Sequence, residues 1–166
     1  MRDAEGFDEF YRGTSGRLLR YGYALTGDLA EAQDIVQEAY VRAWQRWRKL
    51  ASYDSTESWV RLVVARLATD RWRRMRSQRV ALRRAGPPDH VAAPSDDTVL
   101  LVGALRRLPP VQRQAIALYY LCDMSVAEIA AETDAPPGTV KSWLSRGRAG
   151  LAAVLDDLTP EAHDVG

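Results

Sequence analysis

Apolar residues recur at helical spacing along nearly every patterned stretch of this chain, and no stretch of the sequence shows the alternation of a β-strand. In 28–50 the apolar positions continue through four turns, and Asp28 and Glu31 form a pair of the capping-box type at its start. A looser helical pattern, interrupted by two glycines, covers 7–25. The spacing therefore predicts an all-α fold.

A second long helix is predicted over 57–79, and its outward side becomes steadily more basic along the chain. We expect Trp59 and Trp72 to pack on its apolar side. Positive charge near a helix C-terminus is favourable by about 0.3–1 kcal/mol per residue, but a single last turn cannot use seven arginines. These arginines are Arg61, Arg66, Arg71, Arg73, Arg74, Arg76 and Arg79. Their number indicates a further role for this face.

The clearest break in the helical pattern lies at 85–97, where three prolines and a glycine interrupt the periodicity. This break predicts two small helical domains, 1–84 and 98–158, joined by a flexible linker. Each is large enough to fold alone. An acidic tail follows at 159–166, and we expect the linker and tail to favour solubility rather than to cover the basic faces.

Charge is distributed unevenly, although the formal net charge is only +1. The stretch 51–84 carries nine basic and three acidic residues, and 137–155 carries three basic residues and no acid. Between them, 85–136 has a net charge of −4. Two basic surfaces on one molecule indicate two contacts with a polyanion such as nucleic acid.

Several classes of function are disfavoured by what the sequence lacks. Cys122 is the single cysteine, which excludes an internal disulfide framework and a multi-cysteine metal site, and its apolar neighbours favour burial. His90 and His163 have no second ligand at metal spacing, and no nucleophile–base pair or phosphate-binding glycine loop is present, so we expect no catalytic site, metal or cofactor. No apolar run is long enough to span a membrane, and the first residues do not resemble a signal peptide, so we expect a cytoplasmic protein.

The most specific pattern in the chain is that of a helix-turn-helix. Ser125 and Glu128 predict a capped helix start, the pattern breaks at 133–135, and Pro137 opens a second helix without acids until Asp156. In this motif the second helix enters the major groove of DNA. The residues predicted to be buried in that helix are Val140, Leu144, Leu151 and Leu155. A plain helical hairpin with a solvated basic face is the alternative, which the coincidence of cap, turn and acid-free face disfavours.

Three stretches resemble the extracytoplasmic-function sigma factors, which are two-domain promoter-specificity subunits of bacterial RNA polymerase. They are DLAEAQDIVQEAYVRAWQRW at 28–47, SWVRLVVARLATDRWRRMR at 58–76, and 108–151 with its LPPVQR, SVAEIA and GTVKS runs. They follow the family's order and spacing and cover about half of the chain. The resemblance implies a non-enzymatic subunit that directs promoter-specific transcription initiation.

The resemblance also implies a different contact for each part of the chain. The helix at 28–50 would dock on the clamp helices of the largest polymerase subunit through Asp34, Gln37, Glu38, Arg42 and Arg46. The loop and helix at 51–79 would hold the opened minus-ten promoter element, because single-stranded DNA needs a positive groove and aromatic platforms. The residues concerned are Tyr53, Arg61, Arg66, Asp70, Arg73, Arg74 and Arg76. The helix at 137–150 would contact the minus-thirty-five duplex through Thr139, Lys141, Ser142, Trp143, Ser145, Arg146 and Arg148.

A regulatory partner is also implied by the resemblance, namely an anti-sigma protein that clamps the two domains together and covers both DNA-binding faces. Two positions depart from the common family pattern: Arg66, where many members have asparagine, and Trp143, where many have a basic residue. Both bear on the promoter sequence that is recognised. The residues alone are also compatible with an autonomous helix-turn-helix regulator, although no dimer seam is visible, and with a helical adaptor whose binding to a protein partner is insensitive to salt.

Overall fold

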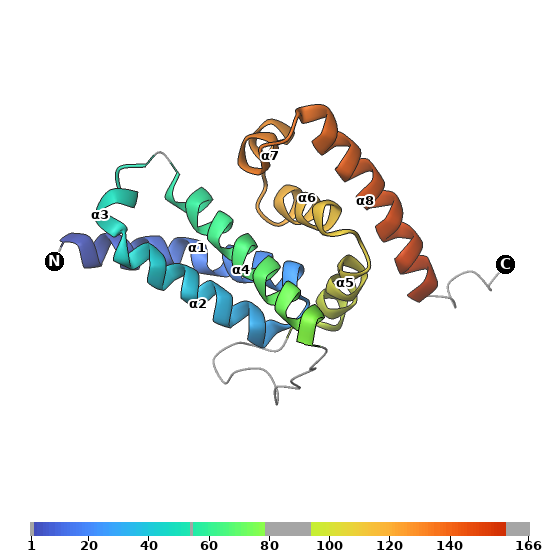
Figure 1. The fold of residues 1–166 in the computed structure, drawn as a ribbon, viewed down its shortest axis with the longest axis horizontal. Helices are drawn as coiled ribbons and strands as arrows, with labels where there is room; N and C mark the ends of the chain where they lie inside the picture. The colour runs from blue at the N-terminus through green and yellow to red at the C-terminus, as the bar shows by residue number, and fades with distance from the viewer. Residues whose placement is uncertain (1, 54, 79–93, 159–166) are drawn as a thin grey trace. The chain divides into compact units, whose positions relative to one another are not determined.

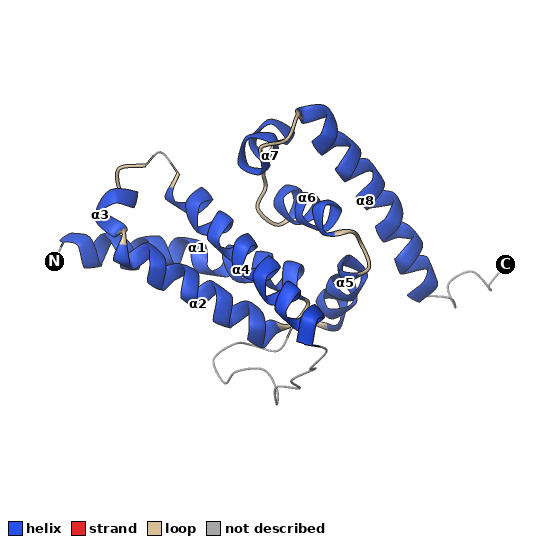
Figure 2. Ribbon diagram, in the orientation of Figure 1, coloured by secondary structure: helices blue, strands red, loops and turns tan. Residues whose placement is uncertain are grey.

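The computed structural model describes residues 2–53, 55–78 and 94–158, and all regular structure in these ranges is helical (Figures 1 and 2). The helices are α1 (Arg2–Thr26), α2 (Leu29–Gln45), α3 (Trp47–Leu50), α4 (Thr56–Gln78), α5 (Asp96–Arg106), α6 (Pro110–Tyr120), α7 (Val126–Thr133) and α8 (Pro137–Leu158). The all-α prediction is confirmed. The chain divides into two compact units, Met1–Val91 and Ala92–Gly166, which we call the N-terminal and C-terminal units. Within the described ranges, no helix is long and apolar enough to cross a membrane.

The N-terminal unit is built from α1, α2 and α4, each of which packs against the other two. Its fully buried side chains include Leu18 and Tyr21 of α1, Ile35 of α2 and Val60 of α4. The first two helices approach closely where α1 carries Gly22, because a Cβ atom there would come within 3.1 Å of the Val36 side chain. These contacts form one apolar core between the three helices.

The helix boundaries differ from the sequence prediction in two places. Helix α1 continues unbroken through Gly13 and Gly16, since both lie on its exposed side, where glycine costs only its lower helix propensity of about 1 kcal/mol. The stretch 28–50 is two helices rather than one, because the backbone leaves helical geometry at Arg46. At its start, the side chain of Asp28 accepts a hydrogen bond of 3.0 Å from the Glu31 amide, as the capping pattern predicts.

A buried polar contact fixes α1 against α2. The Thr14 hydroxyl donates to the Phe10 carbonyl oxygen at 2.7 Å, so the Tyr40 hydroxyl, 2.7 Å from Thr14 Oγ1, is the donor in the contact between the two side chains. The rings of Phe7, Phe10 and Tyr11 pack around the Tyr40 ring. Burial raises the pKa of Tyr40 to about 12, so its hydroxyl stays protonated and able to donate at neutral pH.

In the C-terminal unit, α8 packs against α5, α6 and α7. Helix α8 lies very close to α6 at Gly147, where a Cβ atom would come within 2.9 Å of Ile116. Val140 and Leu144 are buried, as the sequence predicts, whereas Leu151 and Leu155 are only half-buried in the later turns of α8. The first half of α8 is therefore the part that is fixed most firmly in this core.

Arg113 joins α6 to the end of α5. Its Nε donates to the carbonyl oxygen of Leu105 at 3.0 Å, and its Nη2 donates to those of Arg106 and Leu108 at 3.0 and 3.1 Å. The last carbonyl groups of a helix have no partners within that helix. The Arg113 guanidinium supplies such partners for α5 and for the turn that follows it.

We expect Arg113→Ala to destabilise the α5–α6 corner by about 2–3 kcal/mol, because hydrogen bonds from a charged donor contribute about 1.5–3 kcal/mol and the carbonyl oxygens of Arg106 and Leu108 lose this donor. Hydrogen exchange of the amides at 98–120 in the full chain measures this loss of protection. Arg106→Ala is the matched control, since it removes an exposed arginine from α5 and leaves the backbone carbonyl in place. Equal protection in the two variants would contradict the role of Arg113.

Candidate polymerase and nucleic-acid interfaces

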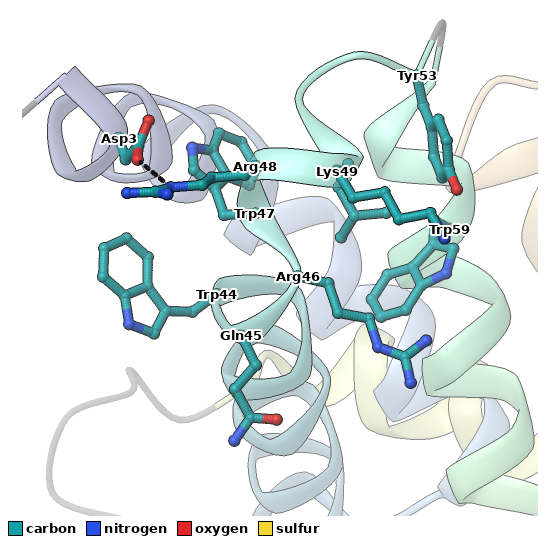
Figure 3. Close-up of a pocket in the computed structure, with 10 residues that line it drawn as sticks. Asp3, Trp44, Gln45, Arg46, Trp47, Arg48, Lys49, Tyr53 and Trp59 are labelled. Carbon is teal, nitrogen blue, oxygen red and sulfur yellow. Dashed lines mark hydrogen bonds and ion pairs between the residues drawn. The ribbon is translucent and has the colours of Figure 1, made fainter.

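A pocket of about 680 Å³ lies in the N-terminal unit where α2 gives way to α3 (Figure 3). Most charged groups on its walls are basic, and Asp3 is paired with Arg48 at 3.1 Å. The lining residues are Asp3, Trp44, Gln45, Arg46, Trp47, Arg48, Lys49, Leu50, Tyr53 and Trp59. The pocket therefore combines indole and phenol rings with cations, which are the two kinds of group that bind unpaired nucleotides.

The rings and cations gather most closely on the α4 side of the pocket. The Arg46 guanidinium lies over the Trp59 ring, with 5.9 Å between Cζ and the ring centroid, a cation–π contact. Tyr53 is 46% exposed, and Figure 3 shows its ring on the same side as Trp59 and Lys49. The sequence groups Arg46 with the docking residues of α2, whereas the structure brings it together with Tyr53 and Trp59.

The tryptophans of α4 are more accessible than the sequence predicts. Trp59 is half-buried on the pocket wall, and Trp72 is 47% exposed. Among the described side chains of α4, the last buried one is Leu67. Trp72 lies beyond it and is exposed among the arginines. The prediction that Trp72 packs in the core is therefore wrong.

Arg61 does not lie on the exposed basic side of α4, where the sequence pattern places it. Its side chain is 9% exposed, with Nη1 3.7 Å from Glu57 Oε1 and Nη2 donating to Ser58 at 2.9 Å. Glu57 also binds Arg17 of α1, at 2.9 Å. The arginine is thus part of an ion-pair network that holds the start of α4 against α1.

The other basic residues of α4 differ in how far they are exposed. Arg66, Arg73, Arg74 and the acidic Asp70 are exposed. Arg71 is half-buried, and its Nη1 lies 3.8 Å from Asp34 of α2. The side chain of Arg76 and the whole of Arg79 lie outside the described part of the chain.

The outward face of α2 carries both polar and apolar groups. Glu38 and Arg42 form an ion pair of 2.7 Å, and Gln37 donates to the Tyr11 hydroxyl at 3.3 Å. Asp34, by contrast, pairs with α4. Sequence reasoning missed two residues of this face: Val41 and Trp44 are about half exposed, although the pattern places Trp44 with the buried apolar residues. Figure 3 shows the Trp44 ring on the side of the pocket away from Trp59.

The helix-turn-helix predicted from the sequence is present in the C-terminal unit. Ser125 and Glu128 form a complete capping box, with both hydrogen bonds at 3.1 Å. Helix α7 ends at Thr133, the next residue Asp134 adopts the left-handed conformation with φ 54°, and α8 begins at Pro137. The turn between the two helices is thus set by local chemistry.

The predicted DNA-contacting residues of α8 all lie outside the core. Lys141, Ser145, Arg146 and Arg148 are exposed, and Thr139, Ser142 and Trp143 are half-buried. Arg148 also bonds to Tyr120 of α6, at 3.1 Å. Since α8 carries no acid before Asp156, its outward face is uniformly neutral or basic over its first five turns.

The remaining sequence predictions concern the linker, the tail and Cys122. Asp96 and Asp97, which the pattern places in the linker, form the first turn of α5, where Ser95 accepts a hydrogen bond from the Thr98 amide. The rest of the predicted linker up to residue 93, with His90, lies outside the described residues, as does the tail with His163. Cys122 is half-buried rather than buried.

Comparison with known proteins identifies the class to which this fold belongs. The family model for sigma-70 region 2 matches residues 10–78, and that for sigma-70 region 4 matches 98–151. The RNA polymerase sigma-E factor of Streptomyces coelicolor is 32% identical over 157 residues, covering 93% of this chain and 89% of the relative. The chain is therefore a member of the sigma-70 class of RNA polymerase sigma subunits.

Within that class, the relatives are extracytoplasmic-function sigma factors. SigL of Mycobacterium tuberculosis, an extracytoplasmic-function sigma factor, is 32% identical over 149 residues, covering 85% of this chain and 84% of its own. The chain belongs to this family of alternative sigma factors, which direct promoter-specific transcription initiation and are not enzymes.

Solved structures agree with this assignment. The sigma factor RpoE of Bartonella quintana, crystallised with the anti-sigma factor NepR, matches with a TM-score of 0.69 at 25% identity, covering 89% of this chain and 97% of that one. CnrH, solved with the cytosolic domain of CnrY, matches with a TM-score of 0.70 at 20% identity, covering 93% and 90%. The second likeness concerns the fold alone.

Proposed function

We propose that this sigma factor recognises two promoter elements in different states, with the C-terminal unit on paired minus-thirty-five DNA and the N-terminal unit on an unpaired minus-ten strand. The observation that carries this proposal is the contrast between the two surfaces. One unit has a pocket lined by aromatic rings and cations, and the other has a helix-turn-helix whose second helix carries no acid before Asp156. The first suits splayed bases, and the second suits the major groove.

The minus-thirty-five contact is assigned to the first half of α8. Ser142 and Ser145 have small side chains that permit close approach to base edges, and the exposed Arg146 can donate two hydrogen bonds to a guanine. Lys141 contacts phosphate, which fixes position rather than sequence. Thr139 and Trp143 lie on the same half of the helix, and the indole of Trp143 offers an apolar contact.

The minus-ten contact is assigned to the side of the pocket that carries Tyr53 and Trp59, and to the outer side of α4. Tyr53 provides an exposed ring for stacking, and the Arg46–Trp59 pair forms the adjacent wall. Arg73 and Arg74 continue the positive surface along α4. If the bases of a strand enter the pocket, its phosphates are expected to contact Arg73 and Arg74. Arg66, Asp70, Trp72 and Arg76 belong to the same proposed surface.

The polymerase contact is assigned to the outward face of α2. Val41 and Trp44 supply an exposed apolar centre, and Gln37, Glu38 and Arg42 supply a polar rim. An apolar centre inside a polar rim is the usual arrangement of a protein–protein interface. We assign this face to the clamp helices of the largest polymerase subunit, with Asp34 at its border.

Val41→Glu is expected to weaken binding to core polymerase by about 10- to 100-fold, because a charge replaces an apolar centre worth about 1–3 kcal/mol. Since Val41 is about half exposed, the fold is expected to keep its stability. Affinity is measured with the full chain and purified core polymerase in the absence of DNA. Ala153→Glu on α8 is a control for added charge at an exposed helical position; equal affinities of the two variants would contradict the docking assignment.

We also propose that the protein works in the cytoplasm, where it meets the polymerase, and that an anti-sigma protein regulates it. The support for the second point is the RpoE relative, which was crystallised with such a partner. A partner of this kind would act by covering the DNA-binding faces of both units. Its removal from a complex with the chain would then restore promoter-specific initiation in a purified system.

Reconstituted transcription tests the proposed function. The chain is added to purified core polymerase with genomic DNA fragments, and the 5′ ends of the transcripts are sequenced. Start sites are expected to become specific and to share two upstream motifs at a constant separation, because polymerase fixes the distance between two weak contacts on one chain. Start sites identical to those of core polymerase alone would contradict the proposal. Tight binding of promoter duplex by the free chain would instead favour an autonomous regulator.

A further inference from the structure

A hydrogen bond joins the second helix of the helix-turn-helix to α6. Arg148 Nη1 lies 3.1 Å from the Tyr120 Oη, and the two residues are 28 positions apart. Both are exposed, Tyr120 by 55%, although their contact brings together two separate helices. The ring of Tyr119 lies edge-on to that of Tyr120, with centroids 4.9 Å apart and planes at 73°. An exposed guanidinium is thus held in a defined place by an exposed phenol.

The direction of this hydrogen bond leaves donors on both side chains. A guanidinium can only donate, so the Tyr120 oxygen accepts, and its own O–H hydrogen remains to be donated. Arg148 keeps four further N–H groups. The contact with Tyr120 raises the pKa of Arg148 above its usual value, so the group stays charged. Two donors, one of them cationic, therefore meet at one point of the surface and suit an oxyanion with two acceptor oxygens.

The position of the pair in the motif indicates which oxyanion it meets. Arg148 follows the base-contacting part of α8 by two residues, and Tyr120 ends α6 shortly before the capped start of α7 at Ser125. In a helix-turn-helix the first helix crosses the DNA backbone while the second lies in the groove. Tyr120 lies at the end of α6 and Arg148 lies on α8 beyond the residues assigned to base edges, so we assign the pair to a phosphate rather than to a base edge.

We propose that Tyr120 and Arg148 form a clamp for one phosphodiester group of the minus-thirty-five duplex, in which Tyr120 is the positioning residue for the Arg148 guanidinium. This inference rests on the proposed function and adds to it a residue outside α8. Holding the arginine in place before DNA arrives reduces the side-chain entropy that is lost on binding. The clamp fixes the register of α8 on the duplex and leaves the choice of sequence to Arg146 and its neighbours.

The test uses holoenzyme assembled from the full chain and core polymerase. The probe is a duplex that carries the minus-thirty-five region of a promoter mapped with the wild-type chain and stops short of the minus-ten element. The dissociation constant is measured over a series of KCl concentrations. Arg148→Ala is expected to weaken binding about ten-fold and to lower the slope of log K against log salt by about 0.9. Tyr120→Phe keeps the charge and is expected to weaken binding about three- to ten-fold.

A double variant and a control variant distinguish a positioning role of Tyr120 from a role in packing. Because Tyr120 acts through Arg148, the Tyr120→Phe change is expected to add nothing in the Arg148→Ala background. Tyr119→Phe removes the neighbouring hydroxyl, keeps the ring pair, and is expected to bind like the wild type. Wild-type affinity of Tyr120→Phe, or a full additional loss in the double variant, would overturn the clamp.

Two further outcomes have distinct meanings. If Tyr120→Phe weakened binding to core polymerase without DNA and left the DNA affinity of the assembled holoenzyme unchanged, the tyrosine pair would be a protein contact and the clamp would be overturned. If the wild-type holoenzyme did not prefer this duplex to an unrelated one, the minus-thirty-five assignment would fail, and the clamp with it. A wild-type preference that Tyr120→Phe fully retains overturns the clamp alone.

Discussion

Replacing Tyr53 with alanine is expected to slow formation of the open promoter complex by about 10- to 100-fold, because stacking of a base on an aromatic side chain is worth about 1–3 kcal/mol. Tyr53 is 46% exposed at the mouth of the pocket, on the same side as Trp59 and Lys49 (Figure 3). Its removal therefore takes away a platform for a base and costs the fold little. Binding of the upstream duplex is expected to stay unchanged.

Permanganate reactivity of thymines in a promoter fragment measures how fast the strands separate with reconstituted holoenzyme. Tyr53→Phe is the matched control, since it keeps the ring and removes only the hydroxyl, and it is expected to open DNA at the wild-type rate. Arg73→Ala should also impair opening, with recognition of the duplex largely kept. Wild-type opening by Tyr53→Ala would show that the pocket holds no base at Tyr53.

Arg146→Ala is expected to lower transcription from the cognate promoter by about 10- to 100-fold and to relax base preference near minus thirty-five. A bidentate contact between arginine and guanine discriminates against the wrong base by about 1–3 kcal/mol. Arg146 is exposed on the part of α8 that also carries Ser142 and Ser145. The loss should therefore be confined to one or two positions of the element.

Transcription from a promoter library with a randomised minus-thirty-five region, read by sequencing, measures this preference. Lys141→Ala is the matched control, because it removes one positive charge from the same helix at a position assigned to phosphate. It is expected to weaken all promoters about equally and to leave the base preference intact. An Arg146→Ala variant with the wild-type base preference would rule out its assignment to a base edge.

Much of the helix-turn-helix is predictable because its chemistry is local. Ser125 and Glu128 are three residues apart and cap the same helix, and Pro137 stands in a first turn where its missing N–H costs nothing. Periodicity likewise places Val140 and Leu144 on one face, and the structure buries both. In these cases a residue's role depends on neighbours within about one turn of the chain.

The missed features depend on where other helices begin and end. Periodicity places Trp72 on the side of α4 that carries Val60 and Val64, but it does not say that the buried positions end at Leu67. Arg61 looks exposed in the charge pattern, and its pair with Glu57 is four residues away on the same helix. The sequence does not show that Glu57 also pairs with Arg17 of α1, which places this part of α4 against α1. Long-range contacts of this kind have no signature in a single sequence.

The candidate sites also combine features that the sequence predicts with contacts that only the structure shows. The basic character of α4 and α8 is visible in the sequence, whereas the Arg46–Trp59 contact requires the turn between α2 and α3. The Tyr120–Arg148 bond connects residues that no local pattern relates. The sequence thus predicts which segments contact DNA, and the structure is needed to say which side chains lie together.

The central claim is that the two units hold one promoter in two states, and site-specific crosslinking in the assembled promoter complex tests it most directly. A photo-crosslinking amino acid is placed at position 53 in one chain and at position 145 in another. We expect position 53 to crosslink to a base that permanganate shows to be unpaired, and position 145 to an upstream base that stays unreactive. Crosslinks from both positions to paired DNA would contradict this account.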